Sequence, residues 1–300
     1  MNGESVIKTI LNRSVRRSRL SRRLRRRQRL RKLVSGTLMT AAFTSVVDVL
    51  AVEPRWTKVK TVDVPIPNLP PAWEGVRIVQ LTDLHVGKFV SLDYIRKVVR
   101  KTNSLSPDVI VLTGDYVSQT EAITDDFARV LSGLCARYGK FGVLGNHDHW
   151  EGAQAVRQLL RKAGITDLTN KSVLLERAGE QICLAGVDDL WTSHQDLSGA
   201  LKGVPEDVPR ILLSHNPDYA EEMPAEPRVD LMLCGHTHGG QFKVPFGSQL
   251  WLPIRHSKYA AGLVEGPHCL VYTSVGVGMV GLPIRFNCRP EISLIILRRR

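Results

Sequence analysis

The chain is poor in cysteine, and its few cysteines are far apart. Five occur in 300 residues, with no C-x-x-C pair, at Cys135, Cys183, Cys234, Cys269 and Cys288. This spacing indicates neither a zinc knuckle nor a disulfide framework, so buried thiols are expected instead. The sequence also lacks an internal repeat and an internal linker. One large α/β domain is therefore expected, although the length alone would also allow two.

Outside its first 32 residues the chain has no net charge. Residues 1–32 contain 13 of the 41 Lys and Arg residues and one of the 29 Asp and Glu residues, so this basic tail carries the whole formal charge of +12. The remaining 28 basic and 28 acidic residues cancel. Positive charge can mark a nucleic-acid-binding protein, but here it belongs to a tail. The balanced body argues against nucleic acid as a partner.

Residues 33–52, LVSGTLMTAAFTSVVDVLAV, are mostly apolar and directly follow the basic tail. A basic region ahead of about twenty apolar residues is typical of a signal peptide or a signal anchor. Asp48 weakens this interpretation, because a carboxylate in hydrocarbon is costly. Two alternatives stay open: an amphipathic helix on an anionic lipid surface, and a tail that binds nucleic acid or ribosomes.

From residue 56 onward, short apolar runs alternate with segments of helical spacing. Leu92, Ile95, Val98 and Val99 share one face of a predicted helix that Ser91 caps. Further helices are predicted around 125–135 and 155–163, and strands at 76–81, 108–113, 140–145, 172–176, 181–187, 210–214, 229–234, 269–274 and 291–297. Both halves of the chain contribute strands. The predicted fold class is therefore α/β, a two-sheet β-sandwich flanked by helices (α/β/β/α), over residues 56–297.

Polar residues that can bind metals follow five of the predicted strands. In chain order these residues are Asp83 and His85, then Asp115, then Asn146, His147 and Asp148, then His215, then His236 and His238. Ligand-binding residues collect just beyond the carboxyl ends of strands in such sheets. Asp, Asn and His are hard and borderline ligands of divalent metals. Each motif alone has an ordinary explanation as a turn, but their joint occurrence favours a metal site.

The ordered motifs resemble those of the calcineurin-like metallophosphoesterases. That family's blocks D-x-H, G-D, G-N-H-[DE], H and G-H-x-H stand here as Asp83-Leu84-His85, Gly114-Asp115, Gly145-Asn146-His147-Asp148, His215 and Gly235-His236-Thr237-His238. The resemblance covers roughly residues 56–297. GHTHGGQ, together with Pro283-Ile284-Arg285 further on, is similar to a bacterial branch of membrane-associated or exported phosphoesterases that includes UDP-2,3-diacylglucosamine hydrolases.

The resemblance implies two divalent metal ions. Asp83, His85, Asp115 and His238 would hold the first, and Asp115, Asn146, His215 and His236 would hold the second. Asp115 is common to both sets, so its carboxylate would bridge the ions. Two such ions activate a bridging hydroxide as the nucleophile and clamp the phosphoryl oxygens. Mixed carboxylate and imidazole ligation suits Mn, Fe or Zn better than Mg or Ca.

His147 is the predicted catalytic residue and not a predicted ligand. The resemblance places it near the leaving-group oxygen, where it would donate a proton or stabilise charge. Many phosphatases of the family orient this histidine with an Asp three positions after the bridging Asp, where this chain has Ser118. Asp148 is an alternative partner for His147. Asp188 is a weaker candidate for supporting a ligand, since an ordinary turn also explains it.

The predicted activity is a metal-dependent phosphoesterase acting on a phosphodiester or a pyrophosphate. One candidate substrate is a lipid-linked nucleotide sugar such as UDP-2,3-diacylglucosamine, from lipid A synthesis. The alternatives are a general phosphodiesterase or phosphatase and, in a different class, a non-catalytic membrane or nucleic-acid adaptor. All seven ligand positions are filled, which disfavours the adaptor.

We expect attachment to the inner membrane of a bacterium, or export across it. The basic N-terminus predicts an external domain, whereas a lipid-precursor substrate predicts a cytoplasmic one, so the side of the membrane stays open. Trp150, Trp191, Phe242 and Trp251 are candidates for lining a lipid approach, although ordinary packing also explains such aromatics.

Overall fold

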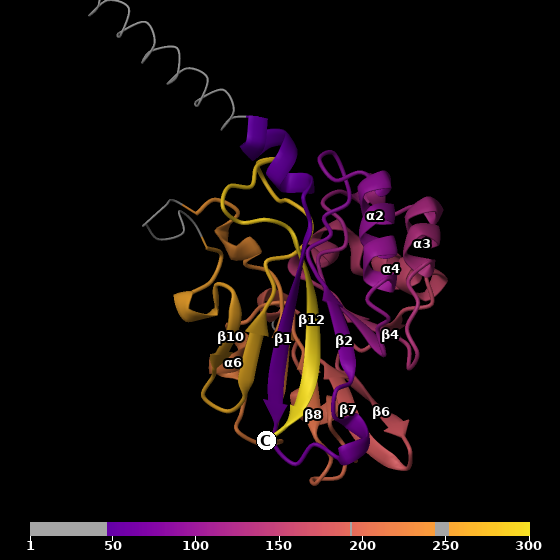
Figure 1. The fold of residues 1–300 in the computed structure, drawn as a ribbon, viewed down its shortest axis with the longest axis vertical. Coiled ribbons are helices and arrows are strands. Elements are labelled where there is room, and N and C mark those ends of the chain that lie inside the picture. Colours follow the sequence, from indigo (N-terminus) through magenta and orange to yellow (C-terminus); the bar gives the residue numbers. More distant parts are fainter. Residues whose placement is uncertain (1–46, 193, 244–251) are drawn as a thin grey trace, which may run out of the picture. The chain divides into compact units, whose positions relative to one another are not determined.

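The computed structural model describes residues 47–192, 194–243 and 252–300, and the described residues form two six-stranded sheets (Figure 1). In spatial order, the first sheet contains β1 (Lys58–Ile66), β12 (Glu291–Arg299), β2 (Arg77–Leu81), β3 (Val109–Thr113), β4 (Lys140–Val143) and β5 (Thr166–Asp167). The second contains β10 (Gly262–Glu265), β11 (Leu270–Thr273), β9 (Leu231–Cys234), β8 (Arg210–Leu213), β7 (Glu180–Gly186) and β6 (Lys171–Arg177). Both sheets are mixed, with parallel strands at their centres.

Helices cover the outer face of each sheet. They are α2 (Leu92–Asn103), α3 (Asp125–Ser132) and α4 (Asn146–Lys162) beside the first sheet, and the short α5 (Leu197–Ala200) and α6 (Tyr219–Glu222) beside the second. Single turns are η1 (Asp48–Val52), η2 (Glu53–Arg55), η3 (Pro71–Trp73), η4 (Thr120–Ala122), η5 (Leu190–Thr192), η6 (His238–Gly240) and η7 (Ser257–Tyr259). The order of layers is thus helix, sheet, sheet, helix, which confirms the predicted fold class.

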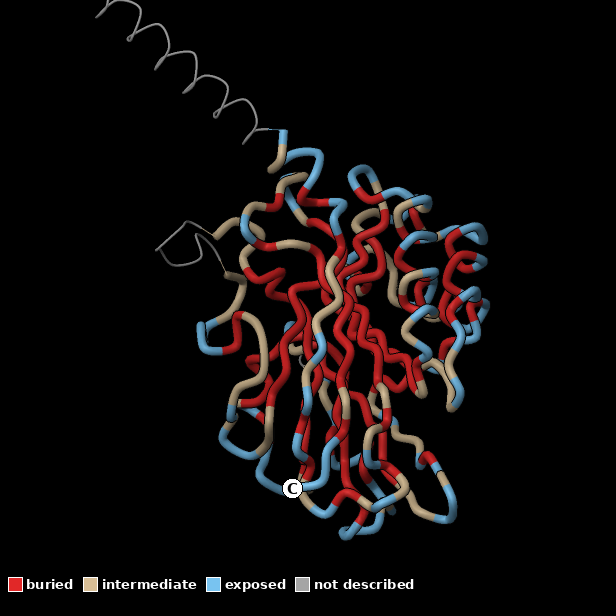
Figure 2. The backbone as a smooth tube through the Cα atoms, in the orientation of Figure 1, coloured by how far each residue is buried: buried red, intermediate tan, exposed pale blue. Residues whose placement is uncertain are grey.

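The alternation of side chains along each central strand accounts for these layers. In β3, Val109 and Val111 belong to the core between the sheets, whereas Ile110 and Leu112 face the helices. In β9, Leu231 and Leu233 enter the same central core from the other sheet. A strand covered on both faces carries apolar residues at successive positions. Figure 2 shows the resulting buried strands along the middle of the domain.

The predicted helix at Ser91 is confirmed, since the Ser91 hydroxyl accepts a hydrogen bond from the Tyr94 N–H at 3.3 Å. The sequence did not predict β1, which pairs in parallel with β12 at the edge of the first sheet. The first half of β1 is largely polar and half-buried, and Pro65 lies near its end. An edge strand tolerates both features, because one side of its backbone needs no partner.

Two predictions concern segments that the structure covers only in part. The basic tail, residues 1–32, lies outside the described residues, as do residues 33–46 of the predicted apolar segment. In the described part of the chain, no helix is both long enough and apolar enough to span a membrane. The predicted domain bounds of 56–297 stay a prediction, while the two sheets extend from Lys58 to Arg299.

The expectation of buried thiols holds for three cysteines. Cys183, Cys234 and Cys288 are buried. It is wrong for Cys135, which is exposed, and Cys269 is only half-buried. Cys135 lies in the loop that leaves α3, where the backbone runs over the surface.

A fully buried guanidinium organises the loop between β11 and β12. Arg285 donates hydrogen bonds to the carbonyl oxygens of Val275, Gly276, Gly278 and Cys288, at 2.6 to 3.2 Å. These carbonyls belong to an irregular loop, and a planar donor with several N–H groups can bind all of them at once. The loop is consequently fixed from within.

We predict that Arg285→Lys lowers the free energy of unfolding by about 3 kcal/mol, because an ammonium group cannot reach all four carbonyls. Urea denaturation of the metal-free protein measures this change. Arg96→Lys on the exposed face of α2 is the matched control and should have no measurable effect. Equal stability of the Arg285 variant and the wild type would show that the loop does not depend on the guanidinium.

Candidate metal centre

Seven side chains predicted as metal ligands meet where the two sheets present the carboxyl ends of their strands. They are Asp83, His85, Asp115 and Asn146 from the first sheet, and His215, His236 and His238 from the second. All seven are buried. The structure therefore brings together the complete predicted set, drawn from loops up to 155 positions apart in the sequence.

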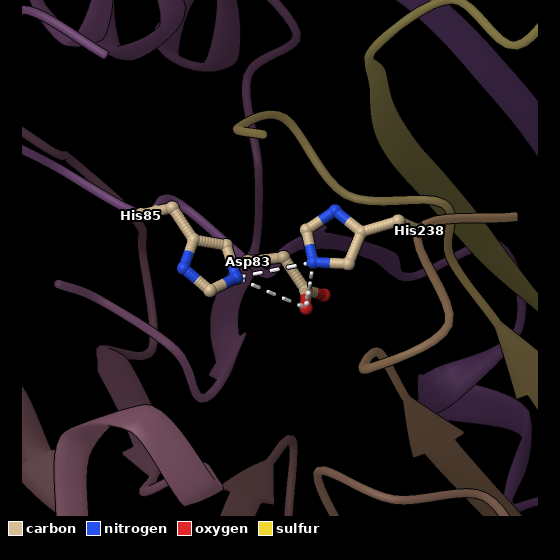
Figure 3. A group of neighbouring side chains, drawn as sticks. All are labelled: Asp83, His85 and His238. Atoms are coloured by element: carbon tan, nitrogen blue, oxygen red, sulfur yellow. Dashed lines mark hydrogen bonds and ion pairs between the residues drawn. The ribbon is translucent and has the colours of Figure 1, made fainter. Parts of the chain in front are cut away.

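Asp83, His85 and His238 form the first cluster (Figure 3). His238 Nε2 lies 3.2 Å from Asp83 Oδ1 and 3.0 Å from His85 Nε2. The Asp83 carboxylate also accepts hydrogen bonds from the Thr82 hydroxyl at 2.8 Å and from the His236 N–H at 3.1 Å. The His236 N–H also lies 3.2 Å from Asp83 Oδ1, the oxygen that faces the imidazoles, so both carboxylate oxygens are held in place.

Asp115, His215 and His236 form the second cluster. Asp115 Oδ2 lies 3.3 Å from His215 Nε2 and equally 3.3 Å from His85 Nε2, which belongs to the first cluster. His236 Nδ1 lies 3.1 Å from His215 Nε2. The His215 ring is oriented by its Nδ1 atom, which lies 2.7 Å from the carbonyl oxygen of Thr113. One carboxylate oxygen of Asp115 is thus shared between the clusters.

The backbone is strained at five of these positions. Asp83, His85, Asp115, His236 and His238 have φ between +47° and +69°, in the left-handed region. Residues other than glycine seldom adopt it, and each such residue costs on the order of 1–3 kcal/mol. Strain of this kind concentrates at functional sites, where the surrounding structure holds it in place. The strained loops aim their side chains at one another.

Two motif glycines are required by the close approach of backbone to these carboxylates. A Cβ atom on Gly145 would collide with Asp115 Oδ1, and one on Gly235 would collide with Asp83 Oδ2. Neither glycine has a positive φ, so the backbone conformation does not require glycine. The lack of room for a Cβ atom does. This explains physically why glycine precedes Asn146 and His236.

Opposite charges compensate one another inside the site. Burial alone raises the pKa of the Asp115 carboxyl, but His215 and His85 outweigh burial and hold that pKa well below its ordinary value. Burial likewise lowers the pKa of His215, yet Asp115 and Asp83 hold it well above its ordinary value. The carboxylates thus favour positive charge between them, which a divalent cation supplies.

His147 is only half-buried, and one of its ring nitrogens lies within 4.8 Å of ligand atoms of His85 and Asp115, one residue of each cluster. Its ring is 4.8 Å from that of His85, edge to face. The Ser118 hydroxyl does not orient His147. It lies 2.9 Å from His85 Nδ1 and so supports a predicted ligand. Which group the Ser118 hydroxyl contacts depends on the tertiary structure, so the spacing of residues in the sequence could not predict it.

Asp148 is not a side-chain partner of His147 either. Its buried carboxylate accepts hydrogen bonds from the N–H groups of Gly145, Asp115 and Tyr116, at 2.8 to 2.9 Å. Burial and the nearby Asp115 carboxylate raise the pKa of Asp148 to about 7, although the backbone hydrogen bonds favour the ionised form. Asp148 therefore ties the loop after β3 to the start of α4.

Asp188 contacts a histidine that the sequence analysis did not single out. Its Oδ1 atom lies 2.6 Å from His149 Nε2, so it supports none of the predicted ligands directly. The neighbouring Asp189 is fully buried and accepts a hydrogen bond from the Trp191 N–H. His149 stands two positions after His147 in HDHW, and that repeat was the one signal that could have pointed to it.

Two exposed tryptophans stand at the rim. Trp150 and Trp191 are 62% and 50% exposed and stack with ring centroids 5.8 Å apart. Trp150 also contacts the His147 ring, and Trp191 contacts the His236 ring. Ordinary core packing therefore does not explain these two residues. Phe242 lines a pocket together with His238, and Trp251 lies outside the described residues.

Comparison with known proteins agrees with this geometry. Residues 76–240 match the model of the family described as "Calcineurin-like phosphoesterase". The chain is 38% identical to phosphodiesterase YaeI of Escherichia coli (strain K12) over 225 residues, which cover 74% of this chain and 82% of that protein. It is 34% identical to the uncharacterized metallophosphoesterase YkuE of Bacillus subtilis (strain 168), covering 77% and 82%. A transmembrane protein with metallophosphoesterase domain from Danio rerio is 32% identical, covering 96% and 68%.

Fold, site and relatives together define a metal-dependent phosphoester hydrolase. The chain belongs to the calcineurin-like phosphoesterase family, as the ordered motifs predicted. Members of this family use divalent metals, and the two clusters are the candidate sites for them here. The finer likeness to UDP-2,3-diacylglucosamine hydrolases stays a prediction.

We predict that Asp148→Asn lowers the free energy of unfolding by about 2 kcal/mol. The amide NH₂ group of Asn would replace a carboxylate oxygen that accepts a backbone hydrogen bond, and two donors would then face each other. Urea denaturation of the metal-free protein at pH 8, where the carboxylate is ionised, measures the change. Asp207→Asn, in an exposed loop, is the matched control and should leave stability unchanged. A variant as stable as the wild type would refute this role of Asp148.

Proposed function

We propose that this protein hydrolyses a phosphodiester or pyrophosphate at two divalent metal ions. Asp83, His85, Asp115 and His238 would hold one ion, and Asp115, Asn146, His215 and His236 the other. The observation that carries the proposal is the equal 3.3 Å distance from Asp115 Oδ2 to one imidazole of each cluster. A bridging carboxylate must reach both ions from one rigid strand end, and β3 provides it.

The donor set fits divalent metals. The buried Asn146 Oδ1 has no hydrogen-bond partner in the described part of the chain, which is costly unless a ligand completes it. Four imidazoles, two carboxylates and one amide favour Mn, Fe or Zn over Mg or Ca. When bound, the pair of ions activates water as the nucleophile and offsets charge on the phosphoryl oxygens.

His147 is the proposed catalytic side chain. Burial outweighs the nearby Asp115 carboxylate and lowers the pKa of His147, so the imidazole is neutral at pH 7. A neutral ring still offers one N–H group, which would hydrogen-bond the leaving-group oxygen as negative charge develops there. The backbone N–H of His147 donates to Asp115 Oδ1 at 2.9 Å, which couples the position of His147 to that of the shared carboxylate.

Two substrates are candidates. One is a lipid-linked nucleotide sugar such as UDP-2,3-diacylglucosamine, and the other is a simpler phosphodiester. We also propose association with a bacterial inner membrane, or export across it. The support for both is the basic tail of residues 1–32 followed by the apolar segment 33–52. Every predicted ligand position is filled, which disfavours the hypothesis of a non-catalytic membrane or nucleic-acid adaptor.

An assay of the full chain loaded with Mn²⁺ tests this proposal. The panel contains bis(4-nitrophenyl) phosphate, 4-nitrophenyl phosphate, cyclic nucleotides and UDP-2,3-diacylglucosamine. We expect turnover of at least one diester or pyrophosphate. Asp115→Asn should lower kcat/KM at least about 10³-fold, equivalent to about 4 kcal/mol of transition-state stabilisation. Asp207→Asn should match the wild type. Turnover of none of these compounds, or equal turnover by Asp115→Asn, would reject the proposal.

A further inference from the structure

We propose that an apolar pocket beside the candidate metal centre binds an alkyl chain of the substrate, an inference that rests on the proposed phosphoesterase function. The pocket has a volume of about 490 Å³. Its lining includes His238, Gln241, Phe242, Val280, Leu282 and Ile284. Ligand sites in proteins commonly fall in this range of volumes.

The pocket adjoins the metal centre through a shared side chain. His238 lines the pocket, while its Nε2 atom lies 3.2 Å from Asp83 Oδ1 in the first cluster. A phosphoester group held at the clusters would therefore have one of its substituents next to the pocket. Trp150 and Trp191, which contact His147 and His236, are not among the residues that line the pocket.

Apart from His238, whose Nδ1 atom has no hydrogen-bond partner in the described part of the chain, the polar side chains of the lining are already paired. The Gln241 amide is used internally, since its Nε2 donates to the Val280 carbonyl at 2.9 Å and its Oε1 accepts from the Val280 N–H at 2.8 Å. The Thr237 hydroxyl donates to the Ala260 carbonyl at 2.8 Å. Phe242, Leu282 and Ile284 carry no polar atoms in their side chains. Away from His238, the lining is thus complementary to hydrocarbon and not to a sugar or phosphate.

The walls of the pocket are held together before any ligand binds. The Phe286 N–H donates to the Gln241 carbonyl at 2.9 Å, and the Phe242 and Phe286 rings pack 4.9 Å apart. The buried Arg285 fixes the loop that carries Val280, Leu282 and Ile284. A preformed pocket loses little affinity to ordering on binding.

The rim of the pocket includes an exposed aliphatic side chain. Leu282 is 64% exposed. Leu50 and Val52 are also exposed, on the segment whose Val49 carbonyl accepts a hydrogen bond from the Arg285 N–H at 3.2 Å. An extended chain that leaves the pocket would cover this rim, whereas a compact apolar group would leave it in water.

Mixed 4-nitrophenyl alkyl phosphodiesters test the inference on the full chain with Mn²⁺. Water attacks phosphorus and 4-nitrophenolate leaves, so every ester gives the same chromophore plus an alkyl phosphate. From ethyl to octyl, we expect kcat/KM to rise by about fourfold for each methylene that enters the pocket, until the pocket is full. A rate independent of chain length would overturn the inference.

Variants locate the effect. Ile284→Trp fills the pocket, and Leu282→Asp places a charge at its exposed mouth, where the fold tolerates it. Each should reduce the octyl-to-ethyl ratio of kcat/KM by at least about tenfold, while the rate on the ethyl ester stays within about twofold. Leu174→Asp, at an exposed leucine of β6, is the matched control and should keep the wild-type ratio. An unchanged ratio in Leu282→Asp would contradict the inference.

A binding measurement separates this inference from the proposed function. We expect the metal-free protein to bind 11-(dansylamino)undecanoic acid at one saturable site, about tenfold more weakly in Leu282→Asp and unchanged in Leu174→Asp. Binding without hydrolysis of any ester would keep the pocket and reject the phosphoesterase function. Hydrolysis of the ethyl ester without such binding would keep the function and reject the pocket.

Discussion

The shared carboxylate of Asp115 is the constraint on which the rest of the site depends. One of its oxygens lies between imidazoles of two clusters, and the other accepts the N–H of His147. Its own N–H is held by Asp148. A buried charge is costly unless opposite charges and hydrogen bonds compensate it, and here both do. The loops around this side chain include five ligand residues with positive φ.

The two-sheet architecture makes this arrangement possible. Each cluster combines residues from both sheets: Asp83 and His85 meet His238, and Asp115 meets His215 and His236. The core between the sheets, with Val109 and Val111 on one side and Leu231 and Leu233 on the other, sets the distance between these loops. The hydrophobic packing that stabilises the fold thus also determines the spacing of the ligands.

Much of this could be predicted from the sequence, and the exceptions have physical causes. Apolar runs ending in Asp83, Asp115 and His215 mark buried strands with polar ends, so the layers and a metal site follow from local patterns. The division of the ligands into two sets came from the resemblance to the family. The polar edge strand β1 carries no such pattern. The partners of Ser118 and Asp148 depend on contacts between loops. The pocket beside His238 combines two irregular segments, neither of which has a periodicity that would reveal it.

The central claim is that two ions share Asp115. Anomalous diffraction from crystals of the full chain loaded with Mn²⁺ tests it most directly. The account predicts two peaks about 3.5 to 4 Å apart, one beside Asp83, His85 and His238 and the other beside Asn146, His215 and His236, with the Asp115 carboxylate between them. A single peak, or peaks that Asp115 does not bridge, would contradict it.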